Sequence, residues 1–231
     1  MNMFRKSAFA ATMAVGLSFA PFANAAPTLS IEIRDGATLI GSAMNVLGGS
    51  ASATASSANF NTISVSALGV PTLPSPDLAS QSLQVTTGST FTNPATLQVM
   101  VTQQGLTGFP AVNLANTFTG NTLTSLGRFS LFTIANYYDS TNAAFGMGTL
   151  MASASYTGIG SFSNGPTTFA ATPGALFSQT SIYTITFTGP QSAISGSAQI
   201  VNVPEPASMA LFGAGLLGLA FARRARNRKQ V

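Results

Sequence analysis

Hydrophobic and polar side chains alternate residue by residue along most of this chain, and this alternation limits the possible fold more than any other feature. The pattern is clearest in the segments 29–34, 62–66, 82–86, 97–102 and 183–188. A period of two buries one set of side chains and leaves the other in water, as in a half-buried β-strand. Segments 129–135 and 150–157 are further strand candidates, and residues 26–202 show no convincing helical stripe.

Glycine and proline residues separate these strand candidates. They lie at Gly48-Gly49, Pro71–Pro76, Gly88, Asn93-Pro94, Gly108–Pro110, Gly158–Pro166 and Pro173-Gly174. Roughly seven to ten strands joined by such turns predict an all-β fold, an antiparallel β-sandwich-like domain over residues 26–202. Asp35-Gly36 favours a turn that pairs the first strand with Thr38–Ile40. The Ser/Ala-rich segment 49–58 is expected to be a loop or a mobile edge.

Charge is concentrated at the two ends of the chain. Seven of the nine Lys and Arg residues lie there: Arg5, Lys6, Arg223, Arg224, Arg226, Arg228 and Lys229. Between residues 26 and 203 the charged residues are Glu32, Arg34, Asp35, Asp77, Arg128 and Asp139, two positive and four negative, for a net charge of −2. Without a basic patch, nucleic acid is not an expected partner.

The residue types that most enzymes use are missing from the sequence. There is no His and no Cys, and the only lysines are Lys6 and Lys229. The chain therefore lacks the bases of nucleophilic triads and the ligands of the usual zinc or copper sites. We expect neither metal nor cofactor. The carboxylates Glu32, Asp35, Asp77 and Asp139 could supply a glycosidase pair, but none lies in a motif, so we predict that the protein is not an enzyme.

Residues 1–25 have the organisation of a signal peptide. Arg5 and Lys6 precede an uncharged apolar run, Ala8–Phe22, and the small residues Ala23 and Ala25 follow it. Signal peptidase accepts this pattern, so cleavage between Ala25 and Ala26 is expected.

The C-terminal segment has three parts with different physical roles. Val203, Pro204, Glu205 and Pro206 form a short motif that its two prolines keep extended. Residues 207–222 are uncharged and as a helix would span about 24 Å, marginal against a hydrocarbon core of about 30 Å. Arg223, Arg224, Arg226, Arg228 and Lys229 then form a cytoplasmic membrane stop. A buried C-terminal helix is the alternative, but nothing in the chain neutralises five like charges.

The motif at 203–207, the apolar helix at 207–222 and the basic tail at 223–229 together resemble a PEP-CTERM sorting tail, which would occupy residues 203–231. The resemblance implies processing near the Pro-Glu-Pro motif by exosortase, a membrane transpeptidase-like protease. It also implies a precursor held transiently in the inner membrane with its domain facing the periplasm. The processed domain would then reach the outer surface or the extracellular matrix.

These features favour an exported structural or adhesive protein of the cell envelope or exopolysaccharide matrix, which binds polysaccharide through polar Ser/Thr/Asn faces. An alternative is binding to ice, because Thr-x-Thr spacing at 117–119, 122–124 and 184–188 would form a hydroxyl array on a flat sheet. A carboxylate-based glycan-active enzyme is a third hypothesis.

Tyr137-Tyr138 could stack on sugar rings, but the favoured interpretation is that one ring lies in the core beside a partly exposed neighbour. Arg128 either pairs with Asp139 or is exposed.

Overall fold

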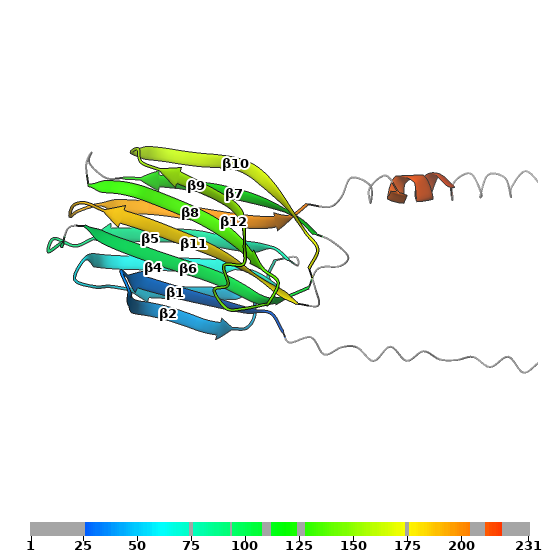
Figure 1. The fold of residues 1–231 in the computed structure, drawn as a ribbon, viewed down its shortest axis with the longest axis horizontal. Coiled ribbons are helices and arrows are strands. Elements are labelled where there is room, and N and C mark those ends of the chain that lie inside the picture. Colours follow the sequence, from blue (N-terminus) through cyan, green and yellow to red (C-terminus); the bar gives the residue numbers. More distant parts are fainter. Residues whose placement is uncertain are drawn as a thin grey trace, which may run out of the picture.

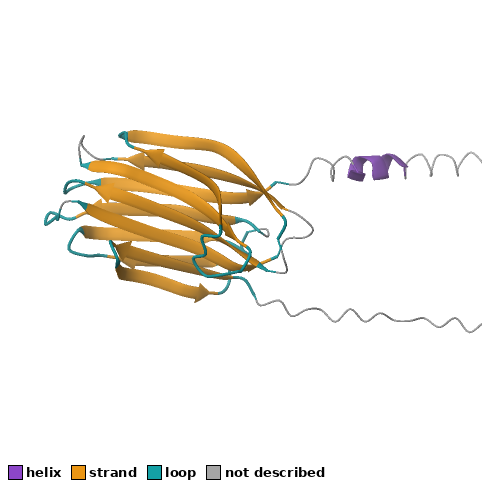
Figure 2. Cartoon of the chain, in the orientation of Figure 1, coloured by secondary structure: helices purple, strands orange, loops and turns teal. Residues whose placement is uncertain are grey.

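The computed structural model describes residues 26–73, 76–92, 94–107, 112–123, 128–173, 176–203 and 211–218. These residues form twelve strands in two antiparallel six-stranded sheets, and a short helix at 211–218 (Figures 1 and 2). The first sheet has the order β2 (Thr38–Val46), β1 (Thr28–Asp35), β6 (Ala95–Leu106), β11 (Phe177–Phe187), β8 (Phe129–Asp139), β9 (Thr149–Tyr156). The second has the order β10 (Gly160–Ala171), β7 (Val112–Thr122), β12 (Ala193–Asn202), β5 (Leu78–Thr87), β4 (Phe60–Leu68), β3 (Ser50–Ala55).

The sandwich confirms the all-β, antiparallel prediction, and Asp35 faces Thr38 across the expected turn. The expected strand count was too low. The Ser/Ala-rich segment 49–58, predicted as a loop or a mobile edge, contains the edge strand β3, and the Gly/Pro-rich segment 158–166 contributes much of β10. The sequence pattern does not predict β7 and β12 as complete strands, because glycine, alanine and asparagine occupy several of their inward positions.

The core between the sheets is apolar and contains closely packed aromatic rings. Phe132 of the first sheet meets Phe162 of the second edge-on, with 5.3 Å between ring centroids. The rings fit because they lie over a cross-strand pair of glycines, Gly120 and Gly196. A β-carbon at Gly196 would lie 2.8 Å from Cζ of Phe132, and one at Gly120 would overlap the ring of Phe162. A larger residue at Gly196 would therefore clash with Phe132 of the opposite sheet, and one at Gly120 would displace the Phe162 ring from the core.

A chain of buried polar side chains links four strands and both sheets. Ser181 Oγ on β11 donates to Asn136 Oδ1 on β8 at 2.8 Å, and Asn136 Nδ2 donates to Asn116 Oδ1 on β7 at 3.0 Å. Asn116 Nδ2 in turn donates to the carbonyl oxygens of Leu114 and Thr167. The side-chain amides of Asn136 and Asn116 are thus both hydrogen-bonded, as burial of polar groups favours.

Both ends of the sandwich chain leave from the same side, which we call the exit end (Figure 1). Thr28 at the start of β1 pairs with Gln104 near the end of β6, and the short connection 107–111 leads from there to β7. Asn202 at the end of β12 pairs with Leu114 near the start of β7. Ala26, which follows the predicted signal-peptide cleavage position, and the start of the sorting tail therefore both lie near the exit end.

Replacing Asn136 with alanine should destabilise the sandwich by about 2–4 kcal/mol, because it leaves the Ser181 hydroxyl and the Asn116 amide oxygen without partners in a dry core. Urea unfolding followed by far-UV circular dichroism measures this. Asn121→Ala on the outer face of β7 is the matched control, with an expected change within about 0.5 kcal/mol. Equal effects of the two substitutions would show that the buried chain of amides contributes nothing specific.

Candidate functional site

The sorting tail begins at the last residues of a central strand. β12 lies between β7 and β5, and its final residue, Asn202, still pairs with Leu114. One residue further, the Val203 N–H donates to the Asn113 carbonyl oxygen at 2.7 Å. The sheet therefore holds the chain up to the first residue of the predicted motif, Val203.

Asp77 fixes the other side of this strand end. Its carboxylate Oδ1 accepts a hydrogen bond from the Asn202 backbone N–H at 2.7 Å. Burial raises the pKa of the Asp77 carboxyl above its ordinary value, and the Asn202 N–H acts more weakly in the opposite direction. The sequence suggests Asp77 as one of four possible catalytic carboxylates, and its contact with Asn202 shows a role in holding the strand end.

The described part of the tail is the helix at 211–218, whose side chains are largely exposed. Leu211 and Phe212 are 76% and 68% exposed. Among the residues that the structure describes, no helix reaches the length and apolar content needed to cross a bilayer. Ala26 is exposed and lies just before β1. The other predicted processing and membrane-stop residues lie outside the described residues: Ala23, Ala25, Pro204, Glu205, Pro206, Arg223, Arg224, Arg226, Arg228 and Lys229.

The outer face of the second sheet carries two rows of uncharged polar side chains, which we call the hydroxyl face. Following the cross-strand neighbours from β10 to β3, one row is Ser163, Thr119, Ser197, Ser82, Ser66 and Ser52, and the other is Ser161, Asn121, Ser195, Gln84, Ser64 and Thr54. Hydroxyls of neighbouring strands bond directly, at 2.7 Å for Thr119–Ser197 and 3.0 Å for Ser66–Ser82. None of the six charged residues of the described sandwich lies in a strand of this sheet.

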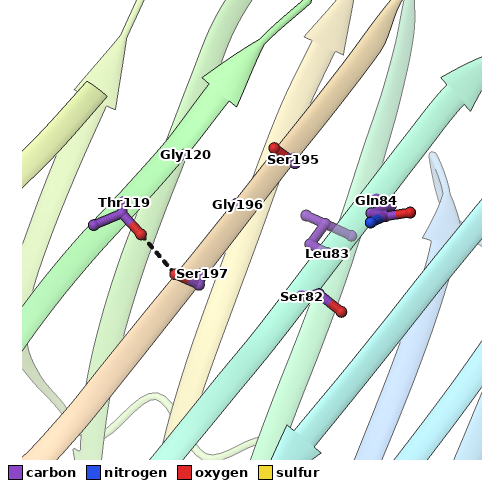
Figure 3. A pocket seen from close by; sticks show the side chains of 8 residues that line it. All are labelled: Ser82, Leu83, Gln84, Thr119, Gly120, Ser195, Gly196 and Ser197. Carbon is purple, nitrogen blue, oxygen red and sulfur yellow. Dashed lines mark hydrogen bonds between the residues drawn. The ribbon is translucent and has the colours of Figure 1, made fainter. Parts of the chain in front are cut away.

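A shallow hollow of about 150 Å³ lies in the middle of the hydroxyl face, over Gly120 and Gly196. Figure 3 shows the side chains of Thr119, Ser197 and Ser82 around it, with the Thr119–Ser197 hydrogen bond at one side. A second hollow of about 320 Å³ shares Gln84 and Ser195 with the first and extends to the exposed side chain of Leu123. Together they form a groove along β5 and β12 with polar walls and one apolar end.

The Thr-x-Thr segments do not form one array. Thr117 and Thr119 lie on the outer face of β7 in the second sheet, whereas Thr184 and Thr186 lie on β11 in the first sheet. Thr122 is buried and donates to the carbonyl oxygens of Gly158 and Gly160.

The acidic residues are also separated. Glu32 pairs with Arg34 at 2.8 Å, and Asp35 accepts hydrogen bonds from Ser57 and Asn59. Asp139 is buried at the end of β8 and accepts hydrogen bonds from the Thr141 backbone N–H and hydroxyl. Among the described residues, no three or more His, Cys, Asp or Glu side chains lie close enough together to hold a metal ion.

Two sequence interpretations have clear outcomes. Arg128 does not pair with Asp139. Its guanidinium donates to the Pro190 carbonyl oxygen and to Gln191 Oε1 instead. Tyr138 is buried and packs on Phe169 and Phe177, while Tyr137 is half-buried, as the core interpretation predicted.

Comparison with known families confirms the C-terminal assignment. Residues 202–226 match the PEP-CTERM protein-sorting motif. The matched segment begins at the residue whose backbone N–H is bound by Asp77. The motif identifies an exported protein that exosortase sorts to the cell surface. No curated protein sequence matches the chain at a significant level.

Replacing Asp77 with asparagine should stabilise the folded protein at pH 7. Burial raises the carboxyl pKa in the folded state, so ionisation destabilises that state as pH rises above the ordinary value of 3.8, and an amide lacks this penalty while keeping an acceptor oxygen. The gain should vanish near pH 3, where the carboxyl is neutral in both states. Urea unfolding at the two pH values tests this, and a loss of stability for Asp77→Asn at pH 7 would contradict it.

Proposed function

We propose that this exosortase-sorted, exported protein is a structural or adhesive component of the cell envelope or exopolysaccharide matrix, with extracellular polysaccharide as its ligand. Its signal peptide is removed by signal peptidase, its C-terminal helix tethers the precursor in the inner membrane, and exosortase separates the sandwich from the tether. The observation that carries the proposal is the combination of a sorting motif with an uncharged, hydroxyl-lined outer sheet face.

The junction between the sandwich and the sorting tail suits cleavage by exosortase. Asn202 and Val203 are held by the sheet, through Asp77 and Asn113, and the two prolines that follow disfavour continuation of either a strand ladder or a helix. A segment that its prolines keep out of ladders and helices, and that starts at a fixed strand end, is one that a protease can bind by its backbone.

Processing should depend on both exosortase and the Pro-Glu-Pro motif. In a host that contains exosortase, the full chain should yield a shorter sandwich fragment that leaves the membrane fraction. Without exosortase, or when Pro204, Glu205 and Pro206 are all replaced by alanine, the longer form should remain in the membrane. Immunoblots of cell fractions, with intact mass spectrometry of the product, give both termini. Equal size and equal membrane retention in both hosts would overturn the sorting route.

A neutral polysaccharide fits the groove along β5 and β12. Hydroxyl and amide side chains such as Thr119, Ser197 and Gln84 can both donate to and accept from sugar hydroxyls. The exposed Leu123 side chain at one end offers an apolar contact for a ring face. Each hydrogen bond contributes only about 0.5–1.5 kcal/mol net, so binding gains strength through repetition along a polymer.

Thr119→Ala combined with Ser197→Ala should weaken binding of a neutral polysaccharide about tenfold, which corresponds to the loss of about 1.4 kcal/mol. The matched control is Thr133→Ala with Ser155→Ala, because this hydroxyl pair, at 3.1 Å, lies on the outer face of the first sheet. Affinity electrophoresis in polysaccharide gels compares the variants. Equal retardation of parent and both variants would exclude the hydroxyl face as the binding surface, and absence of retardation for the parent would exclude this ligand class.

We propose binding rather than catalysis as the activity of the sandwich. Glu32, Asp35, Asp77 and Asp139 each contact a partner within the fold, respectively Arg34, Asn59, the Asn202 backbone and Thr141. These contacts favour a role in holding turns and strand ends.

A further inference from the structure

The exit end of the sandwich carries very little charge. Its charged residues are Asp77, just before β5, and Asp139, the last residue of β8, and both carboxylates accept hydrogen bonds, from Asn202 and from Thr141. Asp35 and Arg128 lie at the opposite end, which we call the far end, where β1 finishes and β8 begins.

Exposed apolar side chains occupy the loops of the exit end. Leu47, in the turn between β2 and β3, is 64% exposed, and Met147, in the loop between β8 and β9, is 61% exposed. Ala143 and Ala144 in this second loop are also exposed. The loop over residues 140–148 runs close to the exit end in front of the first sheet (Figure 1).

Hydrogen bonds hold this loop in one conformation. Asn142 Oδ1 accepts from the Gly105 backbone N–H at 2.7 Å, and the Asn142 carbonyl oxygen accepts from Gln104 Nε2 at 2.8 Å. Ser178 Oγ donates to the Ala143 carbonyl oxygen. Gly146 packs so closely on the Asp139 carboxylate that a β-carbon there would overlap it. Because the loop is already ordered, its apolar tip can dock without a large loss of conformational entropy.

The tail keeps the exit end close to its apolar helix. Val203 is still bonded to the sheet, and only residues 204–210 separate it from the helix at 211–218. Seven residues span at most about 25 Å when fully extended. Any bilayer that takes up the exposed Leu211 and Phe212 side chains therefore lies within that distance of the exit end.

We propose that the exit end of the tethered precursor rests directly on the lipid bilayer, with Met147 and Leu47 in the interfacial region. The inference depends on the proposed function, because it requires the tail to insert. An uncharged apolar tip favours lipid, since interfacial contact buries apolar side chains to a depth of about 5–10 Å without desolvating an ion. The domain would then stand with its far end away from the membrane.

Single tryptophan reporters test this orientation, because the natural chain contains no Trp. Three variants of the precursor, purified from membranes of a host without exosortase, are reconstituted into phosphatidylcholine vesicles with or without brominated acyl chains. Met147→Trp reports on the exit end, and Leu123→Trp, at a far-end position that is 68% exposed, is its matched control. Phe212→Trp reports on insertion of the tail helix. Circular dichroism confirms that each variant is folded, and Leu47→Trp replaces Met147→Trp if that variant is not.

Brominated lipid should quench Phe212→Trp and Met147→Trp at least about twofold, and should leave Leu123→Trp unchanged, because only the first two lie at bilayer depth. Quenching of Phe212→Trp without quenching of Met147→Trp overturns the docking of the exit end and leaves the tether intact. Absence of quenching for Phe212→Trp overturns the tether itself. Equal quenching of Met147→Trp and Leu123→Trp overturns the orientation.

Discussion

The contact of two aromatic rings with two glycines sets the distance between the sheets. Phe132 and Phe162 can meet between the sheets, near the edge strand β10, only because Gly120 and Gly196 face each other across β7 and β12. The same glycines form the floor of the hollow on the outer side of the sheet. The pair of glycines that permits close packing inside therefore lies directly beneath the hollow outside. In a chain without cysteine, such packing must supply the stability that secreted domains often take from disulfides.

The uneven distribution of charge follows the different environments of the chain. The basic clusters lie in the terminal segments, where in the proposed export route they would orient the chain in a membrane, and the sandwich retains only six charged residues. Polarity on its second sheet comes from hydroxyl and amide groups, which remain solvated without attracting ions. A surface of this kind does not discriminate by charge, so its selectivity must come from shape and from the number of hydrogen bonds made at once.

The fold class could be predicted because most strands bury β-branched or aromatic residues at every second position, as in 29–34 and 183–188. β12 was difficult to predict because Gly196 and Ala198 occupy inward positions. β10 was difficult to predict because Gly165-Pro166 interrupts its hydrogen-bond ladder at a bulge. The sorting motif could be located because it depends on local sequence. The hydroxyl face could not be predicted, because it gathers Ser and Thr residues from six strands whose order depends on long-range pairing. The Asp77 contact with Asn202 joins residues 125 positions apart and was invisible for the same reason.

The position of β12 also has a consequence for export. This strand is the last of the sandwich, yet it lies between β7 and β5 in the interior of the second sheet. Until it is in place, that sheet consists of two separate pieces, β10-β7 and β5-β4-β3. A polypeptide that emerges from a translocation channel with its N-terminus first can join these pieces only when Asn202 has emerged. On the proposed export route, completion of folding would therefore coincide with arrival of the sorting motif outside the membrane, and the protease would meet this segment only on a finished domain.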